Sequence, residues 1–441
     1  MTRVVKRTFG VDAILRDRLP RFIKWQSIQS IPIYFFGKTL LSPLAPSTTF
    51  FGAVYAFILF QISLRLFSNW LFLASSPRPV GGASPMEFVY ALLKLECRGR
   101  TKVTLRVVIF VACSGISTSI AIVCLYGSVL FGALGLRGFI IGLVYGWSYK
   151  TCVYDFPIIQ RVPFRRYKSG VGQAFVQAVK LAFIGGVCLL PLSGQLATGD
   201  LIEHVIFFFA SFLVFLCWEL NRNMMQVFMT KRLVFAPTRG SANPSGYLLE
   251  VLEDTTLNPA LRYLAYLDLC MVSETDSDTW RRAALFETSG ETYKRVIAVC
   301  LSSLEQLRLA LNESNEQLFY ELQVCVWGAR IASSLVVRSI KEDDFGVARH
   351  HHAAVLSTLL SSLSAVEALL GKKSAFNDPT AIFSKAYSMA GVLRTSIYEI
   401  MWNFHEEMVT SARDGLLEQK WVTSGGNREL LAHKLRQFLE F

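Results

Sequence analysis

The positions of the basic residues between long apolar runs constrain this chain more than any motif does. Residues 1–219 carry 22 Lys and Arg against 8 Asp and Glu, a net charge of +14, whereas residues 220–441 carry 23 against 25, a net charge of −2. The first half also holds nearly every long apolar stretch, and its basic residues fall mainly in 1–24, 76–106 and 150–171. Proteins that cross a membrane several times keep Lys and Arg in their cytoplasmic segments. The pattern therefore predicts a polytopic membrane protein.

Six apolar stretches are candidate spans, because crossing about 30 Å of hydrocarbon requires about 20 residues. We expect spans at 22–44, 47–75, 107–128, 132–149, 173–197 and 201–220. The first is the weakest, because Lys24, Pro32 and Lys38 interrupt it, and the alternative is a helix that lies flat in the membrane interface. Six spans place every basic segment and both termini on the cytosolic side. Five would place the basic N-terminal segment, 1–21, on the opposite side, so we expect six.

The composition changes after the last apolar stretch. Residues 221–245 predict a juxtamembrane helix followed by a linker rich in Pro, Gly, Ser and Asn. Residues 246–441 are soluble in composition and numerous enough for a core of their own. Apolar residues recur there at helical spacing, and Thr288 with Glu291 fits a capping box that opens a helix. The predicted fold class is therefore all-α: a six-helix transmembrane bundle followed by an α-helical cytosolic or pore-facing domain of five to seven helices.

Catalytic and metal-binding patterns are missing from the sequence. The chain has no P-loop, no G-x-S-x-G, no H-E-x-x-H and no dinucleotide fingerprint. The His350–His352 run would place three rings about 100° apart on a helix, so they cannot share a ligand face, and we interpret it as a polar helix start. Arg65 and Lys180 lie in spans, close enough to span ends to reach the interface, and no acidic residue lies mid-span beside them. We expect no catalytic, cofactor-binding or metal site and no enzymatic activity.

Several segments, taken in order, resemble one known family. In the apolar half they are 76–79 (SPRP), 156–161 (FPIIQR) and 215–220 (FLCWEL), and in the soluble half 264–270 (LAYLDLC), 278–282 (DTWRR) and 290–295 (GETYKR). Together they resemble the nuclear-division-cycle (Ndc-type) transmembrane nucleoporins, with a likeness to plant and green-lineage members. The resemblance implies a non-catalytic scaffold that anchors the nuclear pore complex to the pore membrane, supports its assembly in the nuclear envelope, and so serves nucleocytoplasmic transport of protein and mRNA.

The resemblance also implies partners. These are lipids of the nuclear envelope, linker nucleoporins and other pore-membrane proteins that bind 246–441, and a homo-oligomer within the membrane ring, with no direct nucleic-acid binding. Both termini would face the cytosol or the pore. The residues expected at the membrane surface are Arg161, Arg165, Arg166 and Lys168. The residues expected as partner anchors, with a place in the core as the alternative, are Trp280, Tyr293, Trp327 and Trp402.

A second function remains open on the residues alone, namely a six-span transporter or channel of the endomembrane system. A transporter would bring polar residues together at the middle of the bilayer and would show internal repeats. Neither feature is found in the sequence, so the scaffold is the preferred hypothesis.

Overall fold

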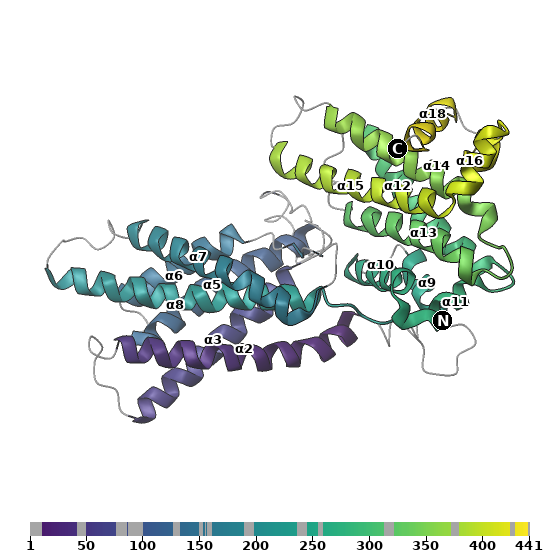
Figure 1. Ribbon diagram of the computed structural model, residues 1–441. Helices are drawn as coiled ribbons and strands as arrows, with labels where there is room; N and C mark the ends of the chain where they lie inside the picture. Colours follow the sequence, from purple (N-terminus) through teal and green to yellow (C-terminus); the bar gives the residue numbers. More distant parts are fainter. Residues whose placement is uncertain are drawn as a thin grey trace. The chain divides into compact units, whose positions relative to one another are not determined.

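The chain is helical throughout the part that the structure describes. The computed structural model describes residues 11–41, 50–75, 86, 100–126, 133–149, 153–154, 156, 161–188, 198–235, 245–254, 259–312, 322–371, 379–423 and 428–439. These residues form no β-strand, which confirms the predicted all-α class. One compact unit is Asp12–Lys231 and the other contains Arg232–Phe441; we call them the membrane bundle and the helical domain (Figure 1).

One helix of the membrane bundle corresponds to each of the six predicted spans. The helices are α2 (Val11–Leu41), α3 (Phe50–Ala74), α5 (Arg100–Tyr126), α6 (Ala133–Ser148), α7 (Pro163–Cys188) and α8 (Thr198–Met229). Four of them, α3, α5, α7 and α8, are long and apolar enough to cross a membrane, whereas α6 is shorter and α2 more polar. Both α5 and α7 begin several residues before the predicted spans, because a helix continues beyond the apolar residues that hydropathy detects.

Gln26 and Ser30 of α2 are buried in the bundle. Ser30 bonds to Gln61 of α3, with the Gln61 Nε2–H donating to the Ser30 Oγ at 2.9 Å. Phe22 packs edge-on against Phe228 of α8, and Tyr34 lies 5.0 Å from Phe60 of α3 between ring centroids. These contacts place α2 along α3 and α8 as a member of the bundle.

Small residues bring α5 and α6 into close contact. A Cβ added to Gly142 would lie 2.4 Å from Thr118 Oγ1 and 2.6 Å from the carbonyl oxygen of Ser114. A Cβ on Gly146 would lie 2.9 Å from the Cα of Val111. Such positions allow two backbones to approach closely inside a membrane, where small residues are common at helix contacts.

The helical domain is built around five helices of sixteen or more residues among those described. They are α10 (Pro259–Glu274), α12 (Glu291–Asn312), α13 (Leu322–Glu342), α14 (His352–Gly371) and α15 (Pro379–Asn403). Shorter helices surround them and raise the number above the predicted five to seven: α9 (Gly246–Glu253), α11 (Thr279–Ala283), α16 (His405–Arg413), α17 (Leu417–Trp421) and α18 (Arg428–Leu439). The linker predicted at 235–245 lies mostly outside the described residues.

Helix α14 is the fifth helix long and apolar enough to cross a membrane. It packs against α12, α15, α17 and α18 within the helical domain, with Val355, Leu359 and Leu363 fully buried. A helix that is apolar on most sides and covered by neighbours is a central core helix of a large domain. The composition of α14 thus reflects its place in the core.

The start of α12 differs from the predicted capping box. The helix begins at Glu291, so Glu291 is its first residue and not the third residue after the cap. The free backbone N–H groups of the first turn are bound instead by side chains further upstream: the N–H of Thr292 donates to Glu287 Oε1 at 3.2 Å, and that of Glu291 to Ser289 Oγ at 3.3 Å. Gly290 has a φ of +65°, a backbone conformation that favours glycine. This turn sets the start of α12 later than predicted.

Candidate functional site

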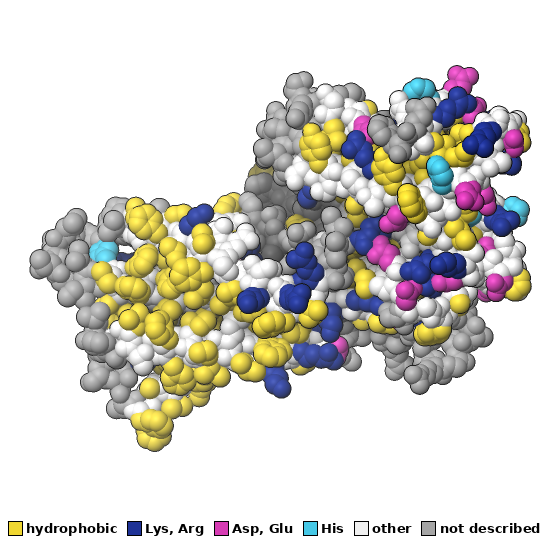
Figure 2. All heavy atoms as spheres, viewed as in Figure 1, with side chains coloured by type: hydrophobic (Ala, Val, Ile, Leu, Met, Phe, Trp, Pro, Cys, Tyr) yellow, Lys and Arg dark blue, Asp and Glu magenta, His cyan; other side chains and the backbone are white. Residues whose placement is uncertain are grey.

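The outer surface of the membrane bundle is rich in large apolar side chains. Phe51 of α3 is 83% exposed, and many of the others are aromatic or β-branched. Figure 2 shows large yellow patches over the face of the bundle that it draws. Soluble monomers do not expose contiguous apolar area on this scale, whereas a membrane covers it with acyl chains. This surface is therefore the lipid-facing surface of the bundle.

Exposed basic side chains gather at one end of the bundle, where α2, α5 and α7 begin and α8 ends. Three hydrogen bonds from α2 to the end of α8, and one from α7, show that the starts of α2 and α7 lie at the end of α8. Lys38 near the end of α2 donates to the carbonyl of Leu125 near the end of α5, so α2 and α5 end, and therefore begin, on the same sides of the bundle. Figure 2 shows dark blue side chains beside the apolar surface. We call this set the basic end, made up of Arg21, Lys24, Lys102, Arg106, Arg161, Arg165, Lys168 and Lys231.

The four predicted membrane-surface residues do not share one environment. Arg161, Arg165 and Lys168 are exposed at the start of α7. Arg166 is half-buried and its Nη2 donates to Thr230 Oγ1 at 2.6 Å, so it helps to join α7 to the end of α8. Three of the four residues are thus available to lipid, and the fourth is a packing contact.

Arg18 binds the carboxyl end of α8. Its guanidinium donates to the carbonyl oxygens of Phe228, Met229 and Lys231 at 3.1, 2.8 and 2.9 Å. The last carbonyl groups of a helix have no partner within the helix and carry its partial negative charge, so an arginine there satisfies them and is stabilised in turn. From the sequence alone, Arg18 could not be distinguished from the other basic residues near the N-terminus.

The buried charge of α8 lies in an aromatic environment. Glu219 is 1% exposed, accepts the Tyr145 hydroxyl proton at 3.0 Å and pairs with Arg222 at 2.6 Å. The neighbouring Trp218 ring stacks on Phe67 of α3, with centroids 3.8 Å apart. Trp218 and Glu219 belong to 215–220, one of the segments that carry the family resemblance, which here forms the centre of the bundle.

A buried ionic network joins the first residues of the helical domain to α10 and α11. Asp268 of α10 is fully buried and accepts hydrogen bonds from Arg232 Nε at 2.7 Å, Arg281 Nη2 at 2.8 Å and the backbone N–H of Phe235 at 2.9 Å. Arg232 also pairs with Asp278. The network therefore holds the segment that follows the last span. Asp268 comes from 264–270, where a charge inside an apolar run was the available signal, and Asp278 and Arg281 come from 278–282.

The four predicted partner anchors separate by exposure. Trp280 and Trp402 are 56% and 85% exposed. Tyr293 and Trp327 are fully buried in the core of the helical domain, so neither presents a surface to a partner. Only the first pair is available for binding.

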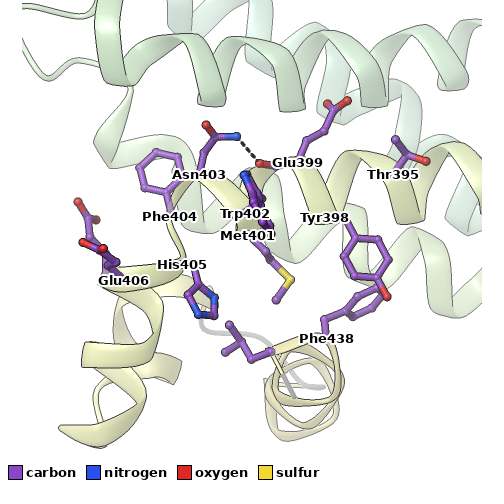
Figure 3. A pocket seen from close by; sticks show the side chains of 12 residues that line it. Thr395, Tyr398, Glu399, Met401, Trp402, Asn403, Phe404, His405, Glu406 and Phe438 are labelled. Carbon is purple, nitrogen blue, oxygen red and sulfur yellow. Dashed lines mark hydrogen bonds between the residues drawn. The ribbon is translucent and has the colours of Figure 1, made fainter. Parts of the chain in front are cut away.

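Trp402 lies in a groove on the surface of the helical domain, with a volume of about 1120 Å³. The groove lies between the end of α15, the start of α16 and the end of α18, as Figure 3 shows. Its lining combines the exposed Trp402 with Tyr398, Met401 and Phe438. We call it the Trp402 groove.

The described residues contain no group of three His, Cys, Asp or Glu side chains that could hold a metal ion. Residues 350–352 were predicted to be a polar helix start, and this describes only part of the run. His350 is exposed, whereas His352 is 7% exposed and packs against Phe404 and Trp421.

Comparison with known proteins identifies the family. No curated protein matches the chain. The family model described as Nucleoporin protein Ndc1-Nup matches residues 189–319 and 314–408, which include α8, the Asp268 network and the helical domain as far as the first residues of α16. The family resemblance of the sequence and the apolar bundle lead to the same result: the chain belongs to the Ndc1-Nup family of nucleoporins, as a member whose bundle contains four helices long and apolar enough to cross a membrane.

Proposed function

We propose that this protein anchors the nuclear pore scaffold to the pore membrane and supports pore assembly in the nuclear envelope. The observation that carries the proposal is the Ndc1-Nup match, which runs from the last helix of the bundle through most of the helical domain. Because the match includes the last helix of the bundle and most of the helical domain, it supports a structural role in which one chain combines insertion into the membrane with binding of soluble pore proteins.

In this proposal the basic end and both termini face the cytosol or the pore. Arg161, Arg165 and Lys168 contact the phosphates of lipid headgroups, each contributing about 1 kcal/mol near an anionic surface. Val162 and Phe164 are 64% and 72% exposed between these charges. An apolar side chain beside a basic one suits the interface, where the ring enters the acyl region and the charge remains in water.

The helical domain binds linker nucleoporins and other pore-membrane proteins in this proposal. The net charge of −2 over residues 220–441 gives no general attraction for nucleic acid, so we expect no direct nucleic-acid binding. A homo-oligomer within the membrane ring is compatible with the same role.

The bundle interior supports a scaffold over a transporter. Arg65 and Lys180 are exposed on the outside of the bundle, where long side chains reach the interface. The buried Glu219 and Arg137 each have a partner inside the bundle, since Glu219 pairs with Arg222 and Arg137 lies 4.0 Å from Glu203. The Arg137–Glu203 pair joins α6 to α8, whereas the Glu219–Arg222 pair lies within α8 and the Tyr145 hydroxyl joins Glu219 to α6.

The test is imaging of the full-length protein with a C-terminal fluorescent tag in its own cells. We expect a punctate nuclear rim that coincides with pore markers, and depletion should lower the density of pores until the wild-type chain is restored. A reticular or plasma-membrane signal that avoids the rim would contradict the proposal and favour the transporter.

A further inference from the structure

The Trp402 groove has an apolar floor that nothing in the described chain covers. Trp402 is 85% exposed although it lies on α15, whose opposite side is buried through Leu393, Ile397 and Ile400. Figure 3 shows Trp402 between Tyr398 on one side and Phe404 and His405 on the other, and Tyr398 meets Phe438 of α18 at 5.0 Å between centroids. Exposed tryptophan beside tyrosine is the side-chain chemistry that dominates binding hot spots.

Carboxylates border this floor. Glu399, Glu406 and Glu407 line the groove, and no Lys or Arg is among the described residues that line it. None of the three forms an ion pair within the described part of the chain. Burial and the nearby Glu274 raise the pKa of Glu399, and Arg330 opposes them.

The basic residues of adjacent turns are already engaged. Arg394 of α15 and Lys434 of α18 both pair with Glu367, and Arg436 pairs with Glu418. Across Phe404, a second hollow of about 520 Å³ contains Arg349 and Lys420 together with Glu406 and Glu407. None of these basic side chains lines the Trp402 groove.

Two helix ends add to the negative potential. Helix α15 ends at Asn403 and α18 ends at Leu439, and both residues line the groove. The carboxyl end of a helix carries a partial negative charge from its unpaired carbonyl groups. The start of α16 contributes the opposite sign, but Glu406 and Glu407 occupy its first turn.

We propose that the Trp402 groove binds a segment of a partner protein in which Lys or Arg residues flank an aromatic or aliphatic side chain. The apolar side chain packs on Trp402, Tyr398 and Phe438, while the basic groups meet the carboxylates and the helix ends. The same charges repel phosphate, which excludes anionic lipid and nucleic acid as the occupant. The inference rests on the proposed function, because it gives the chemistry of a partner of the helical domain.

The test is site-specific photo-crosslinking in cells that express the full-length protein. A photoreactive phenylalanine replaces Tyr398 in the groove or, as a matched control, Tyr387, which is 54% exposed on the same helix and does not line the groove. We expect position 398 alone to capture a partner, and sequencing of the captured segment should show basic residues around an apolar one.

Variants then separate the two parts of the interaction. Trp402→Ala, and the triple change Glu399→Gln, Glu406→Gln and Glu407→Gln, should each lower the crosslink at 398 by roughly tenfold or more, as expected for hot-spot truncation. Phe345→Ala, at a residue 63% exposed outside the groove, controls for loss of an exposed aromatic ring. Neutralising the exposed acids Asp344, Asp414 and Glu429 controls for net charge.

Several results would contradict the inference. Equal capture at 387 and 398, an acidic captured segment, a lipid adduct, or a crosslink to a second copy of this chain would each exclude a basic partner segment. Rim localisation, scored in the same cells, reports on the proposed function independently. A punctate rim without capture at 398 would reject the groove while leaving the pore function in place.

Discussion

His352 shows at the residue scale how a position in the fold sets the chemistry of a side chain. Its ring lies between Phe404 and Trp421, with centroids 5.0 and 6.2 Å away. Ser339 donates its hydroxyl proton to the carbonyl of Val336, so its oxygen can accept from the Nε2–H of His352 at 3.3 Å. Burial lowers the pKa of His352 from 6.5 to about 4, with Arg349 and His351 acting in the same direction and Asp343 opposing them.

The lowered pKa of His352 predicts a loss of stability in acid. The unfolded chain binds a proton near pH 6.5 and the folded chain only near pH 4, so stability is unaffected above pH 6.5 and falls between these values by up to about 3 kcal/mol. Thermal unfolding followed by tryptophan fluorescence measures this, because Trp421 lies beside the ring. His352→Gln should remove this part of the pH dependence, whereas His350→Gln, at an exposed site, should retain it. Equal pH profiles for His352→Gln and wild type would show that another group is responsible.

Asp268 is the residue whose loss should most weaken the start of the helical domain. Asp268→Asn keeps the shape of the side chain but leaves Arg281, only 2% exposed, without its counter-charge. Removing one member of a buried ion pair costs about 3–5 kcal/mol. Glu253→Gln is the control, because the Glu253–Arg295 pair is surface-exposed and such pairs contribute at most about 1 kcal/mol. The free energy of unfolding in urea compares them, and equal losses would mean that the Asp268 network is not important for stability.

The sequence contains part of the information that separates the four predicted anchors. Tyr293 shares the helical spacing of the buried residues Ile297, Cys300 and Leu304, which points to the core. Trp402 follows the buried Ile400 by two residues and so faces roughly the opposite side of its helix. The groove itself could not be predicted, because it depends on the end of α18, which comes from a distant part of the chain.

At the element scale, the close contact of α5 and α6 depends on Gly142. Gly142→Ala places a methyl group within 3 Å of Thr118 and of the backbone of Ser114, so the helices must separate, at a cost of about 1–3 kcal/mol. Gly172→Ala on α7 is the matched control: nothing lies within 4 Å of the added Cβ, and alanine favours a helix by up to about 1 kcal/mol. Thermal unfolding in detergent should show a lower midpoint for the first variant alone. A similar midpoint for both would show that the two helices can move apart without cost.

Hydropathy alone does not distinguish the bundle from the helical domain at two helices, α2 and α14. Helix α2 is too polar to satisfy a hydropathy criterion, because Gln26 and Ser30 face the protein interior while Trp25 and Phe36 are exposed on the outside. Helix α14 satisfies the criterion because protein surrounds it. Hydropathy measures how apolar a helix is but does not report whether lipid or protein covers it, and only the tertiary structure settles that.

At the scale of the whole molecule, six crossings predict which connections reach the lumen. A glycosylation acceptor introduced near residue 45, between α2 and α3, should be modified, whereas one introduced in the connection between α3 and α5 should not. The Asn312-Glu-Ser sequon, whose asparagine is the last residue of α12, serves as an internal control and should remain unmodified, because it follows an even number of spans. Gel mobility before and after deglycosylation measures all three. An unmodified site near 45 would indicate that α2 does not cross the membrane.

The hydrogen bonds of Arg18 have a consequence for biosynthesis. The first helix of the bundle to be synthesised binds the last, and 210 residues separate Arg18 from Phe228. At the usual rate of translation, roughly 10 to 40 s pass between the synthesis of Arg18 and the synthesis of Phe228. Throughout that interval the guanidinium has none of its three carbonyl partners, so the bundle cannot close in the order in which its helices are inserted. A ribosome that stalls before α8 therefore leaves an open bundle with an unpaired arginine on its first helix, a defect that membrane quality control could recognise.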